Sequence, residues 1–331
     1  MRRLIQVGMG GMGAHWATVV ASSGKWQAAA YVDTDRTNLM AAAARHGMPR
    51  NRCYTSLARA LREVEAEALL DVTPQQSRKE VCSAAMECNL HVLCEKPLAD
   101  NLRNAKALVS RAKRLGRTLM VAQNYRYYAA PQTVKRFLAS GKLGDIGYAS
   151  VTFHRGPHFG GFREKMQFPL ILDMAIHHAD LVRYLLDSEV RAVQGATMNP
   201  SWSWFRGDAG LMAVLELENG KCINYQGSWV ATGWETSWNG DWRFDGSQGA
   251  LLLEDDQVFF SSSPANRRKI RPVKWPLTGQ EYLLEAFAAA LESGEPPETA
   301  AADNLKNLAV TYALVRAVKE KRRVTLDELL G

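Results

Sequence analysis

The chain contains an aspartate and a histidine four positions apart, a pair whose residue types and spacing suit catalysis. Residues 173–180 read DMAIHHAD, within a segment whose pattern is helical. On a helix, residues three and four positions apart share a face, so we expect Asp173, His177 and Asp180 on one stripe. A carboxylate beside an imidazole orients the ring and raises its basicity, as a general base requires. The alternative is that His177 has only a structural role, with its hydrogen-bonding groups satisfied inside a half-buried helix.

A lysine followed by a proline supplies the second group. Residues 92–98 read VLCEKPL, so Lys96 comes directly after an expected buried strand. In an open parallel sheet, ligands bind at the carboxyl ends of the strands. An ammonium group at that edge is suited to hydrogen-bonding a reacting hydroxyl and stabilising a developing alkoxide. A surface lysine is the alternative, but it would not explain why Pro97 fixes the turn.

A glycine-rich turn near the start of the chain predicts a dinucleotide site. Residues 8–13 read GMGGMG, after an expected strand and before an expected helix. In such a turn the glycines permit a tight bend, a close approach of the backbone to a pyrophosphate, and close packing of helix on strand. The pyrophosphate then lies at a helix N-terminus, which favours negative charge. We expect the cofactor to contact Gly8, Gly10, Gly11, Met12 and Gly13.

An acidic residue at the end of the next expected strand bears on which dinucleotide is bound. Asp33 lies 20 residues beyond Gly13. A carboxylate at that place accepts hydrogen bonds from the adenosine ribose hydroxyls and repels a 2′-phosphate, which favours NAD over NADP. Arg36 is close enough in the sequence to keep NADP as the less favoured alternative.

Short apolar runs alternate with helical stretches over residues 1–122. The expected strands are 4–7, 28–33, 68–71, 91–94 and 118–122, and the expected helices are 14–22, 38–46, 79–88 and 104–115. Strands that alternate with helices imply βαβ crossovers and a parallel sheet covered on both faces. We therefore expect an α/β fold with a Rossmann dinucleotide-binding domain over residues 1–122.

The pattern changes near residue 123 and indicates a second domain over residues 123–331. The expected strands are 148–154, 190–196, 210–217, 222–230, 241–244, 250–253 and 258–261, and the expected helices are 131–140, 170–186, 281–292 and 303–319. Residues 218–221, ENGK, give a strong hairpin signal. These elements predict an α+β domain with a large, mainly antiparallel open sheet, which would bind substrate and form oligomers.

Composition and charge exclude several classes of protein. The chain is 47% hydrophobic and 23% charged, which is ordinary for a globular protein. The net charge of +7 is a mild excess, and the basic clusters at 267–271 and 319–323 lack interleaved aromatic residues, so we expect no nucleic-acid partner. No apolar run approaches the roughly 20 residues needed to span a bilayer, and the start of the chain does not resemble a signal peptide. We expect a cytoplasmic protein with no membrane partner and with five reduced cysteines.

Taken together, these motifs resemble the Gfo/Idh/MocA family of sugar and cyclitol oxidoreductases. The Glu-Lys-Pro run at 95–97 lies about 85 residues after the glycine-rich turn, residues 173–180 are similar to the family's D-x-G-x-H-x-x-D helix, and residues 303–324 are similar to its last helix and strand. The resemblance implies hydride transfer between a secondary alcohol of a sugar, cyclitol or polyol and NAD. In it His177 is the general base, Asp173 orients substrate and histidine, and Lys96 polarises the oxygen.

The resemblance also implies further contacts. Thr73 and Pro74 would form a turn beneath the cofactor, and Glu95 and Lys96 would also contact it. The Lys96–Pro97 peptide bond is a candidate for the cis form. Arg126 and His154 are candidate substrate contacts, although Arg126 is equally plausible as a structural ion pair. A zinc site from His154, His158, Asp173 and His177 is disfavoured, because His154 and His158 flank Gly156-Pro157 and share no element face, so we expect no metal.

Two departures and two alternative functions accompany the resemblance. Arg78 stands where the family usually has a histidine, and Ala175 replaces a glycine of the Asp/His helix, after Phe168-Pro169-Leu170. One alternative function is glycoside cleavage through transient oxidation by a bound NAD. The other is a catalytically silent NAD-binding regulator, which the presence of both Lys96 and His177 disfavours.

Six of the nine tryptophans fall in one short stretch of the second domain. They are Trp202, Trp204, Trp229, Trp234, Trp238 and Trp242. We expect most of them to serve packing or a subunit interface, and one or two to line the substrate cleft. The broad sheet and these aromatic residues suggest a homodimer or homotetramer.

Overall fold

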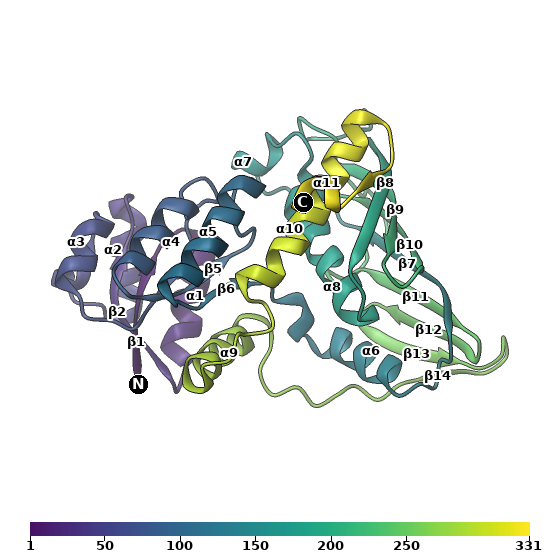
Figure 1. The fold of residues 1–331 in the computed structure, drawn as a ribbon, viewed down its shortest axis with the longest axis horizontal. Helices are drawn as coiled ribbons and strands as arrows, with labels where there is room; N and C mark the ends of the chain where they lie inside the picture. The colour runs from purple at the N-terminus through teal and green to yellow at the C-terminus, as the bar shows by residue number, and fades with distance from the viewer. The chain divides into compact units, whose positions relative to one another are not determined.

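The computed structural model describes all 331 residues, and they form two compact units (Figure 1). Unit 1 contains Met1–Asn124 and Leu277–Leu305, and unit 2 contains Tyr125–Pro276 and Lys306–Gly331. The expected division was 1–122 and 123–331. The difference is the segment Leu277–Leu305, which returns from the last part of the chain to pack within unit 1.

The sheet of unit 1 is wholly parallel and has the order β3-β2-β1-β4-β5-β6. Its strands are β1 (Arg2–Val7), β2 (Trp26–Val32), β3 (Cys53–Tyr54), β4 (Ala68–Asp71), β5 (His91–Glu95) and β6 (Leu119–Ala122). The expected Rossmann sheet is confirmed, and only the two-residue β3 was missed. Because β2 and β4 lie on opposite sides of β1, the chain order reverses at β1, and ligands bind at such a switch point.

Helices connect these parallel strands, as βαβ crossovers require. They are α1 (Gly11–Ser22), α2 (Arg36–His46), α3 (Leu57–Glu63), α4 (Arg78–Glu87) and α5 (Leu102–Leu115), with a 3₁₀ turn η1 (Arg50–Arg52). Local signals set their limits: Asn101 accepts from the backbone N–H of Asn104 where α5 begins, and Gly116 ends α5 in the left-handed region.

The returning segment is held in unit 1 through helix α9 (Gly279–Ser293). The ring of Trp26 on β2 stacks on Phe287, with centroids 5.4 Å apart. The indole N–H of Trp26 also donates to the carbonyl of Leu284 at 3.0 Å. All three residues are buried, so a tryptophan at the start of a Rossmann strand provides the attachment site for α9.

The sheet of unit 2 is mixed and nearly all antiparallel, in the order β14-β13-β12-β11-β7-β10-β9-β8-β15. Its strands are β7 (Ile146–His154), β8 (Val190–Met198), β9 (Gly210–Leu217), β10 (Cys222–Ser228), β11 (Asp241–Gly246), β12 (Gly249–Glu254), β13 (Gln257–Ser261), β14 (Arg267–Lys269) and β15 (Val324–Thr325). Only β7 and β10 pair in parallel. This confirms the expected large, mainly antiparallel sheet, and the hairpin expected at 218–221 joins β9 to β10.

One face of this sheet is covered by helices, among them α6 (Ala129–Ala139) and α8 (Ile176–Leu186) (Figure 1). The remaining helical elements are η2 (Tyr125–Tyr127), α7 (Gly161–Glu164), η3 (Leu170–Ala175), α10 (Ala301–Glu320) and α11 (Asp327–Leu330). The basic cluster 267–269 forms the exposed edge strand β14, where charge discourages pairing with another chain. No helix combines the length and the apolar character needed to cross a membrane.

Candidate functional site

Three turns lie together at the carboxyl edge of the unit 1 sheet. They follow β1, β4 and β5, which are consecutive neighbours in a parallel sheet. The first contains the glycine-rich run, the second Thr73 and Pro74, and the third Lys96 and Pro97. The cofactor-side residues predicted from three distant parts of the sequence therefore share one edge.

The glycine-rich turn has the geometry of a phosphate cradle. Gly8 has a φ of +91°, and a Cβ on it would lie 2.6 Å from the carbonyl oxygen of Val72. A Cβ on Gly13 would lie 2.1 Å from the carbonyl oxygen of Gly8, so only glycine lets α1 approach β1 this closely. Gly10 precedes α1 without any side-chain cap, and Met12 extends an exposed side chain. The first N–H groups of α1 are therefore available to an anion, and these residues fit a dinucleotide.

The carboxylate of Asp33 is tied to the same turn. Its Oδ2 accepts from the backbone N–H of Met9 at 2.6 Å, and its Oδ1 accepts from the backbone N–H of Asp35 at 2.8 Å. The residue is half-buried, whereas Arg36, which supports the NADP alternative, is exposed in the first turn of α2. The acidic group is thus held beside the phosphate cradle, where ribose recognition requires it.

The Glu-Lys-Pro turn after β5 is fixed through its glutamate. Glu95 accepts from the indole N–H of Trp16 at 2.8 Å and from the backbone N–H of Lys96 at 3.1 Å. The Lys96–Pro97 bond is cis, as expected. In the neighbouring turn, the backbone N–H and the hydroxyl of Thr73 both donate to Asp71, and Pro74 is exposed. Glu95 therefore orients the backbone that carries Lys96.

Asp173 and His177 lie in unit 2, on either side of a change in helical geometry. Residues Leu170–Ala175 form a π-helical turn, η3, and α8 begins at Ile176. The expectation that Asp173 and His177 share a face assumed an α-helical period throughout, and that period does not apply across a π-helical turn, which has more residues per turn. Such turns recur at functional sites.

Each of these two side chains has a partner that the sequence did not predict. Asp173 accepts from the guanidinium of Arg163 at 2.8 Å, and this arginine also lies over the rings of Phe159 and Phe162. The buried imidazole of His177 stacks on the ring of Tyr125, with centroids 4.0 Å apart and an interplanar angle of 17°. No period or motif links these pairs, because they join segments that are far apart or irregular.

Arg126 forms a structural ion pair, which is one of the two roles that the sequence left open for it. Its Nε and Nη2 donate to the two carboxylate oxygens of Asp180 at 2.7 and 2.6 Å, and both side chains are buried. The guanidinium also lies over the ring of Tyr184. The bidentate pair commits Arg126 and Asp180 to each other, which argues against a substrate contact for this arginine.

The loops at one edge of the unit 2 sheet concentrate its exposed aromatic residues. The strand pairings His154 with Ser228, Ser228 with Gly210 and Gly210 with Met198 bring the loops that follow β7, β8 and β10 to this edge. The aromatic rim, as we call it, consists of Phe159, Phe162, Trp202, Trp234 and Trp238, all exposed. Trp229 and Trp242 are buried instead and serve packing.

His154 ends β7 at this edge and is half-buried, with its backbone paired to Thr236. His158 stacks on Trp204, with centroids 3.9 Å apart. The next histidine after His177, His178, is buried between Tyr225 and the carbonyl of Trp238, and burial lowers its pKa to about 4. Nowhere do three histidine, cysteine or carboxylate side chains gather as a metal site requires.

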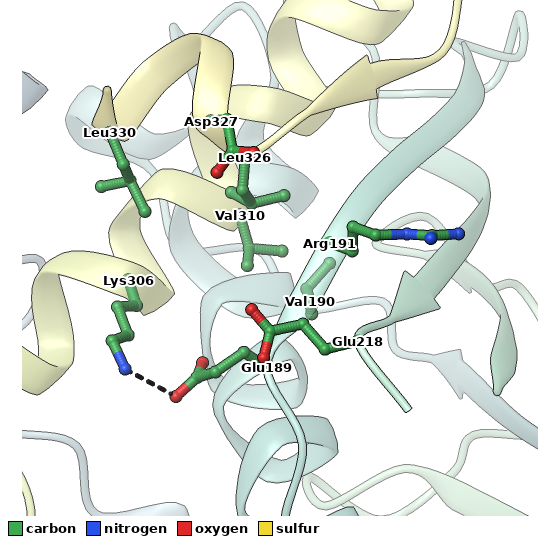
Figure 2. A pocket seen from close by; sticks show the side chains of 9 residues that line it. All are labelled: Glu189, Val190, Arg191, Glu218, Lys306, Val310, Leu326, Asp327 and Leu330. Atoms are coloured by element: carbon green, nitrogen blue, oxygen red, sulfur yellow. Dashed lines mark hydrogen bonds and ion pairs between the residues drawn. The ribbon is translucent and has the colours of Figure 1, made fainter. Parts of the chain in front are cut away.

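Unit 2 also contains a cavity of about 310 Å³ (Figure 2). It is lined by Glu189, Val190, Arg191, Glu218, Lys306, Val310, Leu326, Asp327 and Leu330. Among these residues, the ammonium of Lys306 donates to the carboxylate of Glu189 at 3.0 Å, as the dashed line in Figure 2 marks. None of the site residues predicted from the sequence lines this cavity. We therefore assign the cavity no part in the predicted chemistry.

Comparison with known proteins decides the family. Residues 2–123 match the family profile described as an oxidoreductase family with an NAD-binding Rossmann fold, and residues 131–252 match that of the Gfo/Idh/MocA C-terminal domain. The chain belongs to the Gfo/Idh/MocA oxidoreductase family. The resemblance seen in the Glu-Lys-Pro and Asp/His motifs is confirmed, and so is the prediction of an NAD-binding domain.

Relatives within this family are similar over most of the chain. A D-apiose dehydrogenase from Paraburkholderia graminis is 26% identical over 91% of this chain and 83% of its own length. A myo-inositol 2-dehydrogenase from Thermotoga maritima is 25% identical over 82% of this chain and 83% of its own length. A crystal structure of an oxidoreductase from Agrobacterium radiobacter, in complex with NAD⁺, L-tartaric acid and magnesium, has the same fold, with a TM-score of 0.90, 22% identity and 99% of each chain covered.

Proposed function

We propose that this protein transfers a hydride between a secondary alcohol of a sugar, cyclitol or related polyol and the nicotinamide of NAD. One observation carries the proposal: the phosphate cradle and the Lys96 turn lie at the same carboxyl edge of one parallel sheet, after β1 and β5, with β4 between them. A nucleotide bound at Gly8–Gly13 would extend along this edge toward an ammonium group. NAD, when bound, accepts or returns the hydride.

Lys96 is the residue that acts on the substrate oxygen from unit 1. Its ammonium donates a hydrogen bond to the reacting hydroxyl and stabilises the charge that develops as the proton leaves. The Glu95 carboxylate, anchored by Trp16, holds the Lys96 backbone and limits the positions that the side chain can reach. Preorganised charge of this kind needs no rearrangement at the moment of reaction.

His177 is the general base, and it acts from unit 2. Stacking against Tyr125 fixes the plane of the imidazole, so its ring nitrogens can move only within that plane. Asp173 orients the substrate, and Arg163 in turn holds the Asp173 carboxylate. Loss of a general base usually costs a factor of about 10²–10⁴ in rate.

The substrate class rests on the relatives and on the aromatic rim. The relatives named above are dehydrogenases of apiose and of myo-inositol, both of which are polyhydroxylated and carry secondary hydroxyls. The rim presents flat aromatic faces beside Arg163, which pairs with Asp173. Aromatic faces suit the C–H surfaces of sugar rings, and Asp173 supplies an acceptor for hydroxyl groups.

We also propose that the chain forms a homodimer or homotetramer through the open face of the unit 2 sheet. Tyr148, Met198, Met212 and Val214 are exposed on strands β7, β8 and β9. Apolar residues gathered on an uncovered sheet face are typical of subunit interfaces. Light scattering after size-exclusion chromatography would test this: a monomer at micromolar concentration contradicts it, and Met212→Lys should shift the equilibrium toward monomer.

The decisive experiment is a screen of sugars and cyclitols, followed through the nicotinamide absorbance with wild type, Lys96→Met and His177→Asn. We expect stoichiometric NADH with the wild type, and losses of about 10²-fold or more in both variants. NAD affinity, measured by fluorescence titration, should stay within about threefold, and the exposed Lys113→Met should match wild type. Near-normal turnover in Lys96→Met or His177→Asn refutes the assigned roles. Cleavage of glycosides without accumulation of NADH refutes net hydride transfer.

A further inference from the structure

A buried guanidinium group joins two of the three turns at the carboxyl edge of the unit 1 sheet. Arg78 is the first residue of α4 and is 2% exposed. Its Nη2 donates to the carbonyl of Thr73 at 2.6 Å, and its Nη1 donates to the carbonyl of Pro97. Thr73 follows β4 and Pro97 follows β5, so one planar group spans the turns of two adjacent strands.

The charge of Arg78 is balanced by a buried carboxylate. Asp71, at the end of β4, is fully buried, and its Oδ2 lies 3.5 Å from the Nε of Arg78. This Nε has no hydrogen-bond partner, so the contact with Asp71 is purely electrostatic. Burial lowers the pKa of Arg78, but Asp71 and other acidic neighbours outweigh that effect and leave the pKa raised. The guanidinium therefore stays charged beneath the two turns.

Asp71 completes the connection to the Thr73 turn. Its Oδ1 accepts from both the backbone N–H and the hydroxyl of Thr73, at 2.9 and 2.6 Å, and its Oδ2 accepts from the thiol of Cys82 at 3.3 Å. The two carboxylate oxygens and two of the guanidinium nitrogens thus all have hydrogen-bond partners. We refer to Thr73, Arg78 and Pro97 below as the Arg78 clamp, and to Asp71 as its counter-ion.

The guanidinium group of Arg78 makes the two carbonyl contacts of this clamp from one rigid plane. Its donors point in fixed directions within one plane, so it reaches Thr73 and Pro97 while it faces Asp71. A lysine ammonium would supply the same charge from one compact point, and could satisfy Asp71 without holding both carbonyls. Charge and geometry are therefore separable by substitution at this position.

We propose that Arg78 is a positioning residue, which fixes the Lys96–Pro97 turn against the Thr73–Pro74 turn and thereby preorganises the Lys96 ammonium. This inference rests on the catalytic role proposed for Lys96. A misplacement of about 1 Å in a reacting group costs on the order of 10²-fold in rate, and the clamp contacts the residue next to Lys96 directly. The competing explanation is that Arg78 only neutralises Asp71 and stabilises the fold.

The test compares Arg78→Lys with Asp71→Asn. Arg78→Lys keeps the charge and loses the paired carbonyl contacts, so kcat should fall about 10–100-fold while KM and NAD affinity stay within about threefold. Asp71→Asn removes the counter-charge and leaves both carbonyl contacts, so stability should fall but kcat should stay within about threefold. The control is Arg111→Lys, because Arg111 pairs with Glu87 on the exposed side of α4.

Hydrogen exchange of the backbone amides at 73–77 and 96–99 measures the clamp without using turnover. Exchange should accelerate in both turns of Arg78→Lys and in neither turn of Arg111→Lys. In Arg78→Ala, added guanidinium ion should restore kcat and slow the exchange, whereas methylammonium at equal concentration should do neither. Rescue by both cations would show that charge alone is needed and would overturn the proposal.

The remaining outcomes separate this proposal from the proposed function. Unchanged exchange in Arg78→Lys overturns the clamp, whatever the activity. Faster exchange with wild-type kcat overturns the positioning role. If Arg78→Lys does not fold, a loss of kcat of about 10-fold or more in a folded Asp71→Asn overturns the proposal, because the carbonyl contacts are intact there. Full activity of Lys96→Met refutes the proposed role of Lys96 and with it the positioning role, and the exchange data then still report whether the clamp exists.

Discussion

The ring of Tyr125 lies nearly parallel to the imidazole of His177, with their centroids 4.0 Å apart. Tyr125 is the first residue of η2, and burial raises the pKa of its hydroxyl well above the usual value, so the phenol stays neutral. A neutral ring stacked on an imidazole restricts rotation of the imidazole without changing its charge. The stack therefore gives Tyr125 a role in orienting His177 that no sequence motif indicates.

We expect Tyr125→Leu to lower kcat about tenfold, because His177 then samples ring planes that do not suit proton transfer. Tyr125→Phe retains the stacked ring and should keep kcat within about threefold. Steady-state rates of NADH formation would measure both effects. Equal losses in the two variants would show that the hydroxyl, and not the stack, is what matters.

The ion pair between Arg163 and Asp173 leads to a second prediction. Arg163→Met removes the group that holds the Asp173 carboxylate, and we expect kcat/KM to fall about tenfold. Arg163→Lys should recover only part of this loss, because an ammonium group cannot stack on Phe159 and Phe162 as a guanidinium does. Lys165→Met, an exposed neighbour, serves as the control. Wild-type kcat/KM in Arg163→Met would contradict the orienting role of this pair.

The elements of the candidate site could be located from the sequence where their signals are local. The turn at Gly8–Gly13 depends on backbone conformations and close approaches that only glycine permits, and Asp33 follows it at a fixed spacing, so both could be located. The Lys96–Pro97 turn could be located because it comes directly after a buried strand and carries the Glu-Lys-Pro run. Each of these features is encoded within one βαβ unit.

The rest of the site depends on contacts between distant segments. Arg126 pairs with Asp180, 54 positions away, and nothing in either segment specifies the pairing. The π-helical turn at Leu170–Ala175 preserves the apolar pattern of a helix, so periodicity could not distinguish it from an α-helix. In the sequence, Arg78 stood out only because the family usually has a histidine at that position. Its hydrogen bonds to Thr73 and Pro97 depend on two turns that meet only in the folded sheet.

The close approach between Gly13 and Gly8 predicts a steric effect on stability. Gly13→Ala places a Cβ 2.1 Å from the carbonyl oxygen of Gly8 and must push α1 away from β1. We expect a loss of about 1–3 kcal/mol in the free energy of unfolding, typical of overpacking, together with weaker NAD binding. Gly24→Ala, where a Cβ would meet no atom within 4 Å, should change neither quantity. Urea unfolding and fluorescence titration with NAD would measure the two effects, and an unaltered unfolding midpoint in Gly13→Ala would contradict the steric argument.

The position of Asp33 predicts how the protein distinguishes the two dinucleotides. Asp33→Asn keeps an oxygen for the backbone N–H of Met9 but removes the negative charge. We expect NAD to bind about tenfold more weakly, since hydrogen bonds to charged groups are stronger than neutral ones, and NADP to lose less or to gain. Titrations with both dinucleotides would test this, with the exposed Glu65→Gln as control. An unchanged ratio of the two affinities would remove Asp33 from cofactor discrimination.

The buried imidazole of His178 predicts a dependence of stability on pH. Burial lowers its pKa from 6.5 to about 4, and its ring nitrogens are engaged by the hydroxyl of Tyr225 and the carbonyl of Trp238. Below pH 6.5 the unfolded chain binds a proton on this ring that the folded chain does not bind. Stability should therefore fall as the pH decreases from about 6.5 to about 4, by about 2–3 kcal/mol from this group.

Urea unfolding between pH 7 and pH 4.5 would isolate this contribution by comparison of wild type with His178→Gln. The variant should be less stable at pH 7, because it disturbs the contacts with Tyr225 and Trp238, but its stability should depend less steeply on pH. His15→Gln, which removes an exposed histidine, should keep the wild-type slope. The carboxylates titrate in all three proteins, so the difference in slope between wild type and His178→Gln reports this imidazole alone. Parallel curves for those two would mean that His178 is protonated in the folded protein as readily as in the unfolded chain.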